Sequence, residues 1–480
     1  MMLLGLLYLG VVTVCGMAWK DRLLALCGLV LFGTVSQHPE MPTNIGEIPG
    51  LNPWNVCMLM IVVAWATHQG PELPAPPPWM GVLFGGYVLM LIVGAAVALF
   101  DMDTIVSRQE LLASGRHIRN FEDGLKELFI NPLKYLLMGW LIFAGCRDRK
   151  QAWQVIATLC ILGVAFSLLT YKSLGTNIIS GGHNDVRRLL SKLVGLHAND
   201  LAGLLTCCFW CCVIVGVVQR GRMRMLGVVG AILILPALVG CQSRAAYYAN
   251  GLIAVTLAVV RWRWMFIGMP VAVGLVVALF PQIPERLMQG WDAGESAFEE
   301  DVDYNDVTAG RTKNIWEPFL EDIQKSPIIG HGRLSIARGT SMFEMIRREG
   351  VVPTHPHSSY LELIGDFGVV GLFWTLAMFF CFGFVALRMF LTKEDQLVQI
   401  AGGIGFVAVV NVLALGLSSS FFYPKESMSW LLASMALTTR IWSIYRARGA
   451  APVESAPPAS ETPPLYGAPY PAVSYGRVPL

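Results

Sequence analysis

Charged residues are scarce in this chain, and their scarcity excludes most classes of soluble protein. Only 14% of the 480 residues are Asp, Glu, Lys or Arg, whereas 55% are hydrophobic. The mean hydropathy is +0.56. A chain of this composition cannot cover the surface of a soluble protein of this length, so it predicts a polytopic membrane protein. The net charge of +2 is too small to indicate a nucleic-acid partner.

Neither a secretory leader nor a disulfide framework is expected from the sequence. No basic segment precedes the apolar run 2–19, which we therefore interpret as a first membrane span. All eleven cysteines lie within or at the ends of apolar segments, where a disulfide framework is not expected. Cys207-Cys208 and Cys211-Cys212 have the spacing of zinc ligands, but inside an apolar span their thiols are predicted to be packing groups.

Apolar runs of membrane-spanning length recur along the chain. Because a span needs about 20 apolar residues, we predict an all-α polytopic membrane protein with about 12–13 transmembrane helices and one large extracytoplasmic loop. The predicted spans are 2–19, 22–36, 53–68, 79–100, 131–146, 151–171, 198–218, 225–241, 245–260, 263–281, 364–387, 397–416 and 427–443.

Short basic clusters at the span ends predict the orientation. They alternate along the chain and should mark the cytoplasmic side. The clusters are Lys20/Arg22, Arg147/Arg149/Lys150, Arg220/Arg222/Arg224, Arg261/Arg263, Arg388/Lys393 and Arg440/Arg446/Arg448. Segments 37–52, 101–130, 172–197, 282–363 and 417–426 are then expected on the opposite face, with the N-terminus outside and the C-terminus inside.

Three further segments have features of their own. Residues 115–130 carry apolar residues at helical spacing and predict either a helix along the membrane surface or an amphipathic connector packed on the bundle. The large loop 282–363 is predicted to contain short helices, because Ile315, Phe319 and Ile323 share one helical face and a turn follows at 326–332. The Pro-rich tail 449–480 is predicted to be disordered and cytoplasmic.

A polar stretch stands where the large loop meets the next span. It runs from His355 to Gly368 and contains His357, Glu362 and Asp366. Ionisable groups at such a boundary are costly unless they are paired, solvated or used, so the stretch is predicted to be a functional site. Imidazole titrates near neutrality, which makes His357 a candidate proton acceptor. Both carboxylates lie on other helical faces, and we assign them to helix structure or to a second arginine partner.

Four motifs carry a family resemblance. They are Arg187 with Gly195-Leu196-His197-Ala198-Asn199-Asp200, Ser243-Arg244, Gly310-Arg311 with Gly330-His331-Gly332, and His357-Ser358-x-Tyr360-Leu361 with glycines at 365, 368 and 371. Together they resemble the O-antigen ligase and polysaccharide polymerase superfamily of bacterial inner-membrane glycosyltransferases. The resemblance implies N-terminal transmembrane helices over 1–186, a catalytic region over 187–448 that includes the loop 282–363, and the tail 449–480.

The resemblance also implies a reaction. A glycan on a polyprenyl-diphosphate carrier would be transferred, with inversion, to a hydroxyl of a saccharide, lipid or protein acceptor at the extracytoplasmic face of the inner membrane. Guanidinium groups match phosphate oxygens, so Arg244 and Arg311 are the candidates to hold the diphosphate, and His357 is the candidate to activate the hydroxyl. The candidate substrate-binding residues are Arg187, Arg188, Tyr360 and His331.

No cofactor or metal is expected. The pair His355-x-His357 lacks further ligands at a recognisable spacing, and the acids Asp101-x-Asp103 are expected to be solvated. The lipid bilayer and polysaccharide-export proteins are further partners that the resemblance suggests. Glycines 365, 368 and 371 are predicted to let a neighbouring helix or the lipid carrier approach closely.

Alternative functions remain open at this point. The motifs do not separate a polymerase from a ligase, or exopolysaccharide from lipopolysaccharide as the product. A transporter or flippase of lipid-linked saccharides is the main alternative, although such proteins often show matching halves with broken helices and no internal repeat is evident here. A third hypothesis is an assembly protein that acts through its Pro-rich tail.

Overall fold

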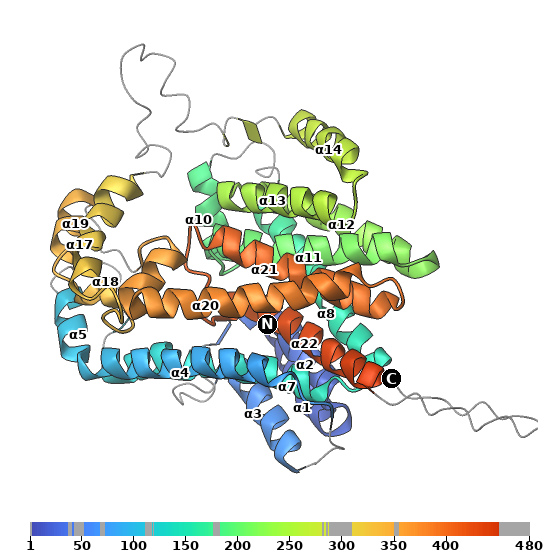
Figure 1. Ribbon diagram of the computed structural model, residues 1–480, viewed down its shortest axis with the longest axis horizontal. Coiled ribbons are helices and arrows are strands. Elements are labelled where there is room, and N and C mark those ends of the chain that lie inside the picture. The colour runs from blue at the N-terminus through green and yellow to red at the C-terminus, as the bar shows by residue number, and fades with distance from the viewer. Residues whose placement is uncertain are drawn as a thin grey trace, which may run out of the picture.

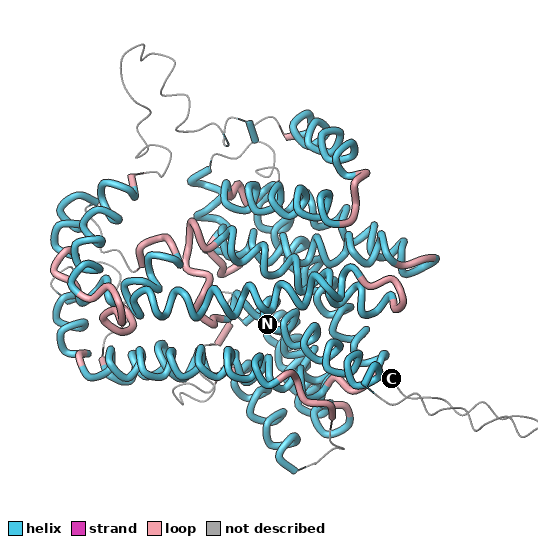
Figure 2. Tube along the Cα trace, in the orientation of Figure 1, coloured by secondary structure: helices cyan, strands magenta, loops and turns pink. Residues whose placement is uncertain are grey.

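The structure is a computed structural model that describes residues 2–36, 41–42, 52–67, 73–110, 118, 120–175, 183–280, 283–284, 287, 310–349 and 355–450. Over these ranges the chain is helical and contains no strand, as Figures 1 and 2 show. The predicted all-α class is therefore confirmed. The Pro-rich tail lies outside the described residues from position 451 onward.

Every predicted span coincides with a helix. The helices are α1 (Met2–Lys20), α2 (Arg22–Ser36), α3 (Pro53–Thr67), α4 (Pro78–Phe100), α7 (Asn131–Gly145), α8 (Arg149–Leu174), α11 (Ala198–Val218), α12 (Gly221–Gly240), α13 (Arg244–Val260), α14 (Met265–Leu279), α20 (Ser359–Leu391), α21 (Gln396–Leu415) and α22 (Ser429–Ala450). Among the described residues, seven helical stretches are long and apolar enough to cross a membrane. A multi-pass membrane protein is therefore confirmed, with fewer full-length spans than predicted.

Helices α11 and α21 form the centre of the bundle, with α13 and α20 nearby (Figure 1). Most side chains of α11 and α21 are buried. Small residues allow the close packing: a Cβ at Gly227 on α12 would overlap the backbone of α11 at Gly216, and one at Gly402 on α21 would overlap α20 at Phe390. Such contacts between small residues are the usual basis of helix association in membranes.

The predicted surface helix at 115–130 is different in the structure. Helix α6 (Phe121–Leu125) continues through a π-helical turn, η1 (Lys126–Ile130), directly into α7. Asn120 caps its start, since its side chain accepts a hydrogen bond from the backbone N–H of Asp123. Leu128 packs in a small cluster with Met102 of α5 (Met102–Glu110). From Phe121 onward the segment is therefore an extension of a span that packs on its neighbours, whereas residues 115–117 and 119 of the predicted segment lie outside the described residues.

Short helices from the large loop gather at the left end of the bundle in Figure 1, close to α5 and the start of α20. They are η3 (Thr312–Trp316), α17 (Glu317–Lys325), α18 (Ser335–Arg338) and α19 (Met342–Glu349). Ile315, Phe319 and Ile323 are buried in one cluster with Ile336 and Met345. The predicted helix near residue 312 and its apolar face are therefore confirmed.

Helix α20 is interrupted at Gly368, whose φ of 64° and ψ of −168° are not helical. The loop that follows α17 fills the interruption. Backbone N–H groups of His331 and Gly332 donate to the carbonyls of Gly365 and Asp366, at 2.9 and 2.8 Å. On the other side of the break, the N–H of Val369 donates to a loop carbonyl at 2.8 Å. The broken helix thus keeps its backbone groups paired.

The glycines of α20 make room for this loop. A Cβ at Gly368 would overlap the carbonyl of Ile328, and a Cβ at Gly365 would overlap the ring of Phe319 on α17. We predicted that these glycines admit a neighbouring helix or a lipid carrier. The structure corrects this for Gly368, where the close neighbour is the loop backbone, because the positive φ and the overlap both require glycine.

Candidate functional site

The candidate site lies where α20 begins. Ser358 is the N-cap of α20. The backbone N–H of Ser359 donates to the carbonyl of Gly416, and its hydroxyl donates to the carbonyl of Ser419, both at 2.7 Å. These bonds fasten the start of α20 to the segment after α21. They hold the residues that precede Ser358 against the same end of the bundle.

His357 has a backbone conformation that non-glycine residues rarely adopt. Its φ is +55°, in the left-handed region. The turn is fixed by two contacts: the backbone N–H of His357 donates to Nδ1 of His355 at 3.1 Å, and Nε1 of Trp316 donates to the carbonyl of Pro356 at 2.8 Å. The two imidazoles meet edge to face, with centroids 4.2 Å apart. Strain of this kind is concentrated at functional sites.

Three arginines come from separate elements. Arg187 and Arg311 lie within electrostatic range of His357, and Arg244 lies within range of Arg187. Arg187 is on α10 (His183–Leu193), Arg244 is the first residue of α13, and Arg311 immediately precedes η3. Nη1 of Arg311 donates to the carbonyl of Ser418 at 3.3 Å. Nε of Arg187 is buried and has no hydrogen-bond partner among the described residues. An unpaired guanidinium N–H in a half-buried position is costly unless it meets an anion.

Burial, together with neighbouring cations, keeps both histidines neutral. Burial, the ring of His355 and the charge of Arg311 together lower the pKa of His357 to about 2. Burial and the charges of Lys425 and Arg311 lower the pKa of His355 to about 4. Burial and the charge of Arg244 lower the pKa of Arg187. The mutual effects show that these side chains share one electrostatic environment, in which a neutral imidazole is available to accept a proton.

A second group of residues builds the wall of the site. Lys425 forms an ion pair with Asp200 of α11 at 2.8 Å. His197 caps α11, because its Nδ1 accepts a hydrogen bond from the backbone N–H of Asn199. The side-chain Oδ1 of Asn199 in turn accepts a hydrogen bond from the hydroxyl of Ser243 at 2.9 Å. This bond joins the starts of α11 and α13. It explains why the motif at 195–200 and the Ser243-Arg244 pair, distant in sequence, belong to one site.

The remaining predicted substrate-binding residues have other contacts. The hydroxyl of Tyr360 donates to the carbonyl of Leu413 at 2.8 Å and so connects α20 to α21. Nε2 of His331 donates to the carbonyl of Asp322 at 2.8 Å, inside the loop. Arg188 points outward with its side chain 80% exposed. Arg187 and Arg311 lie within electrostatic range of His357, and Arg244 lies within range of Arg187. Tyr360, His331 and Arg188 instead have connecting or surface positions.

Sequence reasoning missed a buried ionic cluster beneath the site. Asp366 accepts hydrogen bonds from the backbone and hydroxyl of Ser335 at 3.0 and 2.6 Å, and from the hydroxyl of Tyr423 at 2.7 Å. The guanidinium of Arg333 lies 3.7 Å from this carboxylate and 3.6 Å from the centre of the Tyr423 ring. The prediction of a second arginine partner is therefore confirmed for Asp366. Glu362, one turn earlier, has a buried Oε2 without a hydrogen-bond partner in the described chain.

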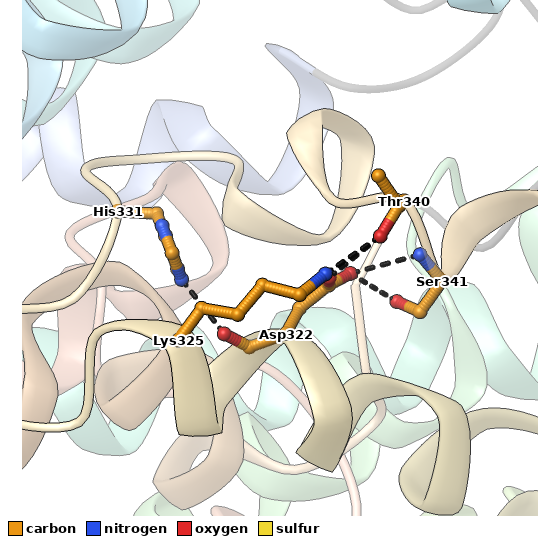
Figure 3. A network of polar contacts seen from close by, with 5 residues as sticks. All are labelled: Asp322, Lys325, His331, Thr340 and Ser341. Carbon is orange, nitrogen blue, oxygen red and sulfur yellow. Dashed lines mark hydrogen bonds and ion pairs between the residues drawn. The ribbon is translucent and has the colours of Figure 1, made fainter.

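A separate network stabilises the loop helices. Figure 3 shows Asp322 at its centre, with Lys325, Thr340 and Ser341 around the carboxylate and His331 at its carbonyl. Oδ1 of Asp322 lies 2.5 Å from Nζ of Lys325, and Oδ2 accepts the backbone N–H of Ser341 at 3.0 Å. The hydrogen bonds from Lys325 and Ser341 lower the pKa of Asp322 despite its burial. The network fixes α17 relative to α19.

The acidic pair that could have held a cation is engaged elsewhere. Asp101, at the end of α4, forms an ion pair with Arg338 at 2.8 Å. Among the described residues no group of three His, Cys, Asp or Glu side chains has the geometry of a metal site. A second acidic stretch in the sequence, residues 299–306, lies outside the described part of the chain.

The comparisons with known proteins agree with this geometry. A family model for O-antigen ligases matches residues 207–376. This segment is similar to the O-antigen ligase family. The match covers about a third of the chain and includes Arg244, Arg311 and His357, while Arg187 precedes it. Comparison with curated proteins found no match.

The resemblance drawn from the motifs is thus confirmed, and the family indicates membrane glycan transfer of the ligase or polymerase type. The chain is accordingly similar to glycosyltransferase-like enzymes that act on glycans and lipids at a bilayer.

Proposed function

We propose that this protein is a membrane glycosyltransferase that transfers a glycan from a polyprenyl-diphosphate carrier to a hydroxyl acceptor, as an O-antigen ligase or polysaccharide polymerase does. One observation carries the proposal: a neutral, strained histidine, His357, lies at the end of the bundle among the charges of Arg187 and Arg311. The site therefore combines a proton acceptor with a positive field that fits an anionic leaving group.

The arginines act on the leaving group. When the bond between the anomeric carbon and the phosphate oxygen breaks, its electron pair remains on the diphosphate. Guanidinium groups from three separate elements stabilise this growing charge from several sides. Arg187 and Arg311 have the direct electrostatic effect on His357, and the charge of Arg244 acts on Arg187, whose pKa it lowers.

His357 acts on the acceptor. Its imidazole removes the proton from the hydroxyl as the oxygen attacks the anomeric carbon opposite the diphosphate, which inverts the configuration. A free-enzyme pKa of about 2 describes a weak base. Binding of the diphosphate raises the pKa of His357, because its negative charges offset the part of the lowering that comes from the neighbouring cations. The base is thus strengthened when the donor is present.

We further propose that the reaction needs no metal and takes place on the extracytoplasmic side of the inner membrane. Positive charge for the leaving group comes from the three arginines, which do for the diphosphate what a divalent cation would do. The site lies at the start of α20, and the basic residue Arg388 lies at the opposite end of that helix. The positive-inside rule then favours an extracytoplasmic site.

The proposed domain organisation follows the site. The region 187–448 supplies all the residues named for the reaction, 1–186 is the N-terminal set of transmembrane helices, and 449–480 is a cytoplasmic tail.

The proposal is tested with the full-length protein in nanodiscs and a fluorescent polyprenyl-diphosphate oligosaccharide as donor. His357→Gln should lower the rate of polyprenyl diphosphate release by about 100-fold or more, within the range of general base catalysis. Arg311→Ala should have a comparable effect, with partial recovery in Arg311→Lys because the charge is retained.

Arg222→Ala is the matched control. Arg222 is exposed in the first turn of α12 and belongs to a basic cluster expected on the opposite face, so this variant should transfer glycan at the wild-type rate. Wild-type rates in both His357→Gln and Arg311→Ala would disprove the assignment. Label that crosses the membrane without a change in glycan attachment would instead identify a transporter.

A further inference from the structure

Two stretches of chain present a continuous apolar surface beside the break in α20. We call it the apolar patch; it consists of Ile328, Ile329, Val369, Val370 and Phe373. All five side chains are exposed, and Ile329 and Phe373 are 73% and 74% accessible. The first two residues belong to the large loop, which the sequence placed in water. An exposed apolar surface of this kind marks an interaction site.

Backbone hydrogen bonds show that the two stretches lie side by side, at the same height along the axis of α20. The N–H of Val369 donates to the carbonyl of Pro327 at 2.8 Å, and the N–H of Val370 donates to the carbonyl of Ile328 at 3.2 Å. The loop also pairs within itself, because the N–H of Gly330 donates to the carbonyl of Ser326 at 3.0 Å. Irregular backbone can enter the apolar part of a bilayer only when its polar groups are paired in this way.

The length of α20 sets the depth of the patch. The helix runs from Ser359 to Leu391 and carries Arg388 in its last turn. A hydrocarbon layer takes about 20 helical residues, so counting back from Arg388 places the other membrane boundary near Gly368. Phe100, the last residue of α4, is a second marker of this membrane boundary, because its apolar side chain is 93% exposed at the end of a span. The side chain of Val97, one turn earlier, lies against the loop at Gly332.

We propose that the loop 326–332 is a membrane foothold, in which Ile328 and Ile329 insert among the lipid acyl chains of the leaflet on the side of the site. The surface is continuous with the lipid-facing side chains of α20 and lies at the depth where its span ends. The loop directly follows α17, and η3 and Arg311 directly precede that helix. If the proposed function holds, the foothold keeps Arg311 at the level where a lipid-borne diphosphate arrives.

Photocrosslinking of the full-length protein in liposomes of phosphatidylethanolamine and phosphatidylglycerol tests the foothold. The photoreactive residue p-benzoylphenylalanine replaces Ile329 in one variant and Phe343 in a control. Phe343 is 49% exposed on α19, in the same polar segment. After irradiation, intact mass spectrometry is expected to detect lipid adducts at 329 at a yield at least fivefold above that at 343.

Equal yields at the two positions, or a crosslinked dimer at 329 in place of lipid adducts, would overturn the proposal. The second result would identify the patch as an interface between copies of the chain. If the variant at 329 does not fold, the same substitution at Ile328 gives the same test, because it faces the same surface. The experiment needs no glycan substrate, so its outcome is independent of the proposed reaction.

Discussion

Removal of the Asp366 carboxylate should destabilise the protein strongly. The substitution Asp366→Leu leaves the backbone N–H and hydroxyl of Ser335 and the hydroxyl of Tyr423 without their acceptor. It also leaves the guanidinium of Arg333 buried without a counter-charge, since the side chain of Arg333 is only 11% exposed. Loss of one partner from a buried charged pair costs about 3–5 kcal/mol, and we expect the free energy of unfolding to fall by that amount.

A double-mutant cycle separates the ion pair from the other hydrogen bonds. Arg333→Met should cost less, about 1–3 kcal/mol, because Asp366 retains its three other hydrogen bonds. The free energy of unfolding of the double variant should fall by about 1–3 kcal/mol less than the sum of the two single effects. No uncompensated charge remains when both groups are removed.

Equilibrium unfolding in mixed SDS micelles measures the free energy of unfolding of the wild type, the two single variants and the double variant. Asp103→Asn is the control: Asp103 is exposed, so this substitution should change stability by no more than about 0.5 kcal/mol. The reasoning fails if Asp366→Leu is as stable as that control, or if the two single effects are simply additive.

Two further results are expected from the same structure. Gly368→Ala should prevent assembly of the native fold, measured as the monodisperse fraction in detergent, because its φ is 64° and its Cβ would overlap Ile328. Gly274→Ala, whose Cβ meets no atom within 4 Å, should behave as wild type, and normal assembly of both would contradict the account of the break. The acid limb of kcat/KM, which reports the free enzyme, should lie below pH 5, because His357 has a pKa of about 2 and is already neutral above that range. The acid limb of kcat should lie at higher pH, since the bound diphosphate raises this pKa, and coincident limbs near pH 6.5 would contradict the proposed electrostatics.

The helices could be predicted because their signal is local. Apolar runs in the sequence coincide with the observed helices within a few residues, since burial in lipid or in the bundle needs only composition and length. Helix α20 is the informative exception. The sequence predicts 364–387, whereas the helix begins at Ser359, because Ser358 caps it and the first turns lie against α17 and α18. Hydropathy does not detect a helix start that is polar and packed on protein.

The break at Gly368 and the ionic cluster were not predictable from local pattern. Both depend on a loop that is about 40 residues earlier in the sequence, and no periodicity within α20 shows that this loop will pair with it. One signal was present: Asp366 is a carboxylate in an apolar span, and such groups usually have a partner. The partner, Arg333, follows a Gly-His-Gly turn directly, but only the fold brings them together.

The strained residues show how these features act together. Among the described residues, three other than glycine have positive φ: Gln242, Leu334 and His357. Gln242 lies two positions before Arg244, and His357 is the proposed base. Leu334 lies between Arg333 and Ser335, which both contact Asp366. Because each strained residue must be held by its surroundings, the buried pairing of Asp366 stabilises the loop turn, and the Ser243–Asn199 bond stabilises the turn before Arg244.

The proposed catalytic residues are therefore held in place by structure outside the site. The segment 417–425 connects the ionic cluster around Asp366 to the proposed site. On the side of the cluster, the hydroxyl of Tyr423 donates to Asp366. On the side of the site, the carbonyl of Ser418 accepts a hydrogen bond from Arg311, and Lys425 pairs with Asp200. A change at Asp366 should then alter the position of Arg311 as well as stability. Asp366→Asn, which keeps an acceptor for Ser335, should show a lower kcat than wild type even where the protein remains folded, and a wild-type kcat in that variant would separate the ionic cluster from catalysis.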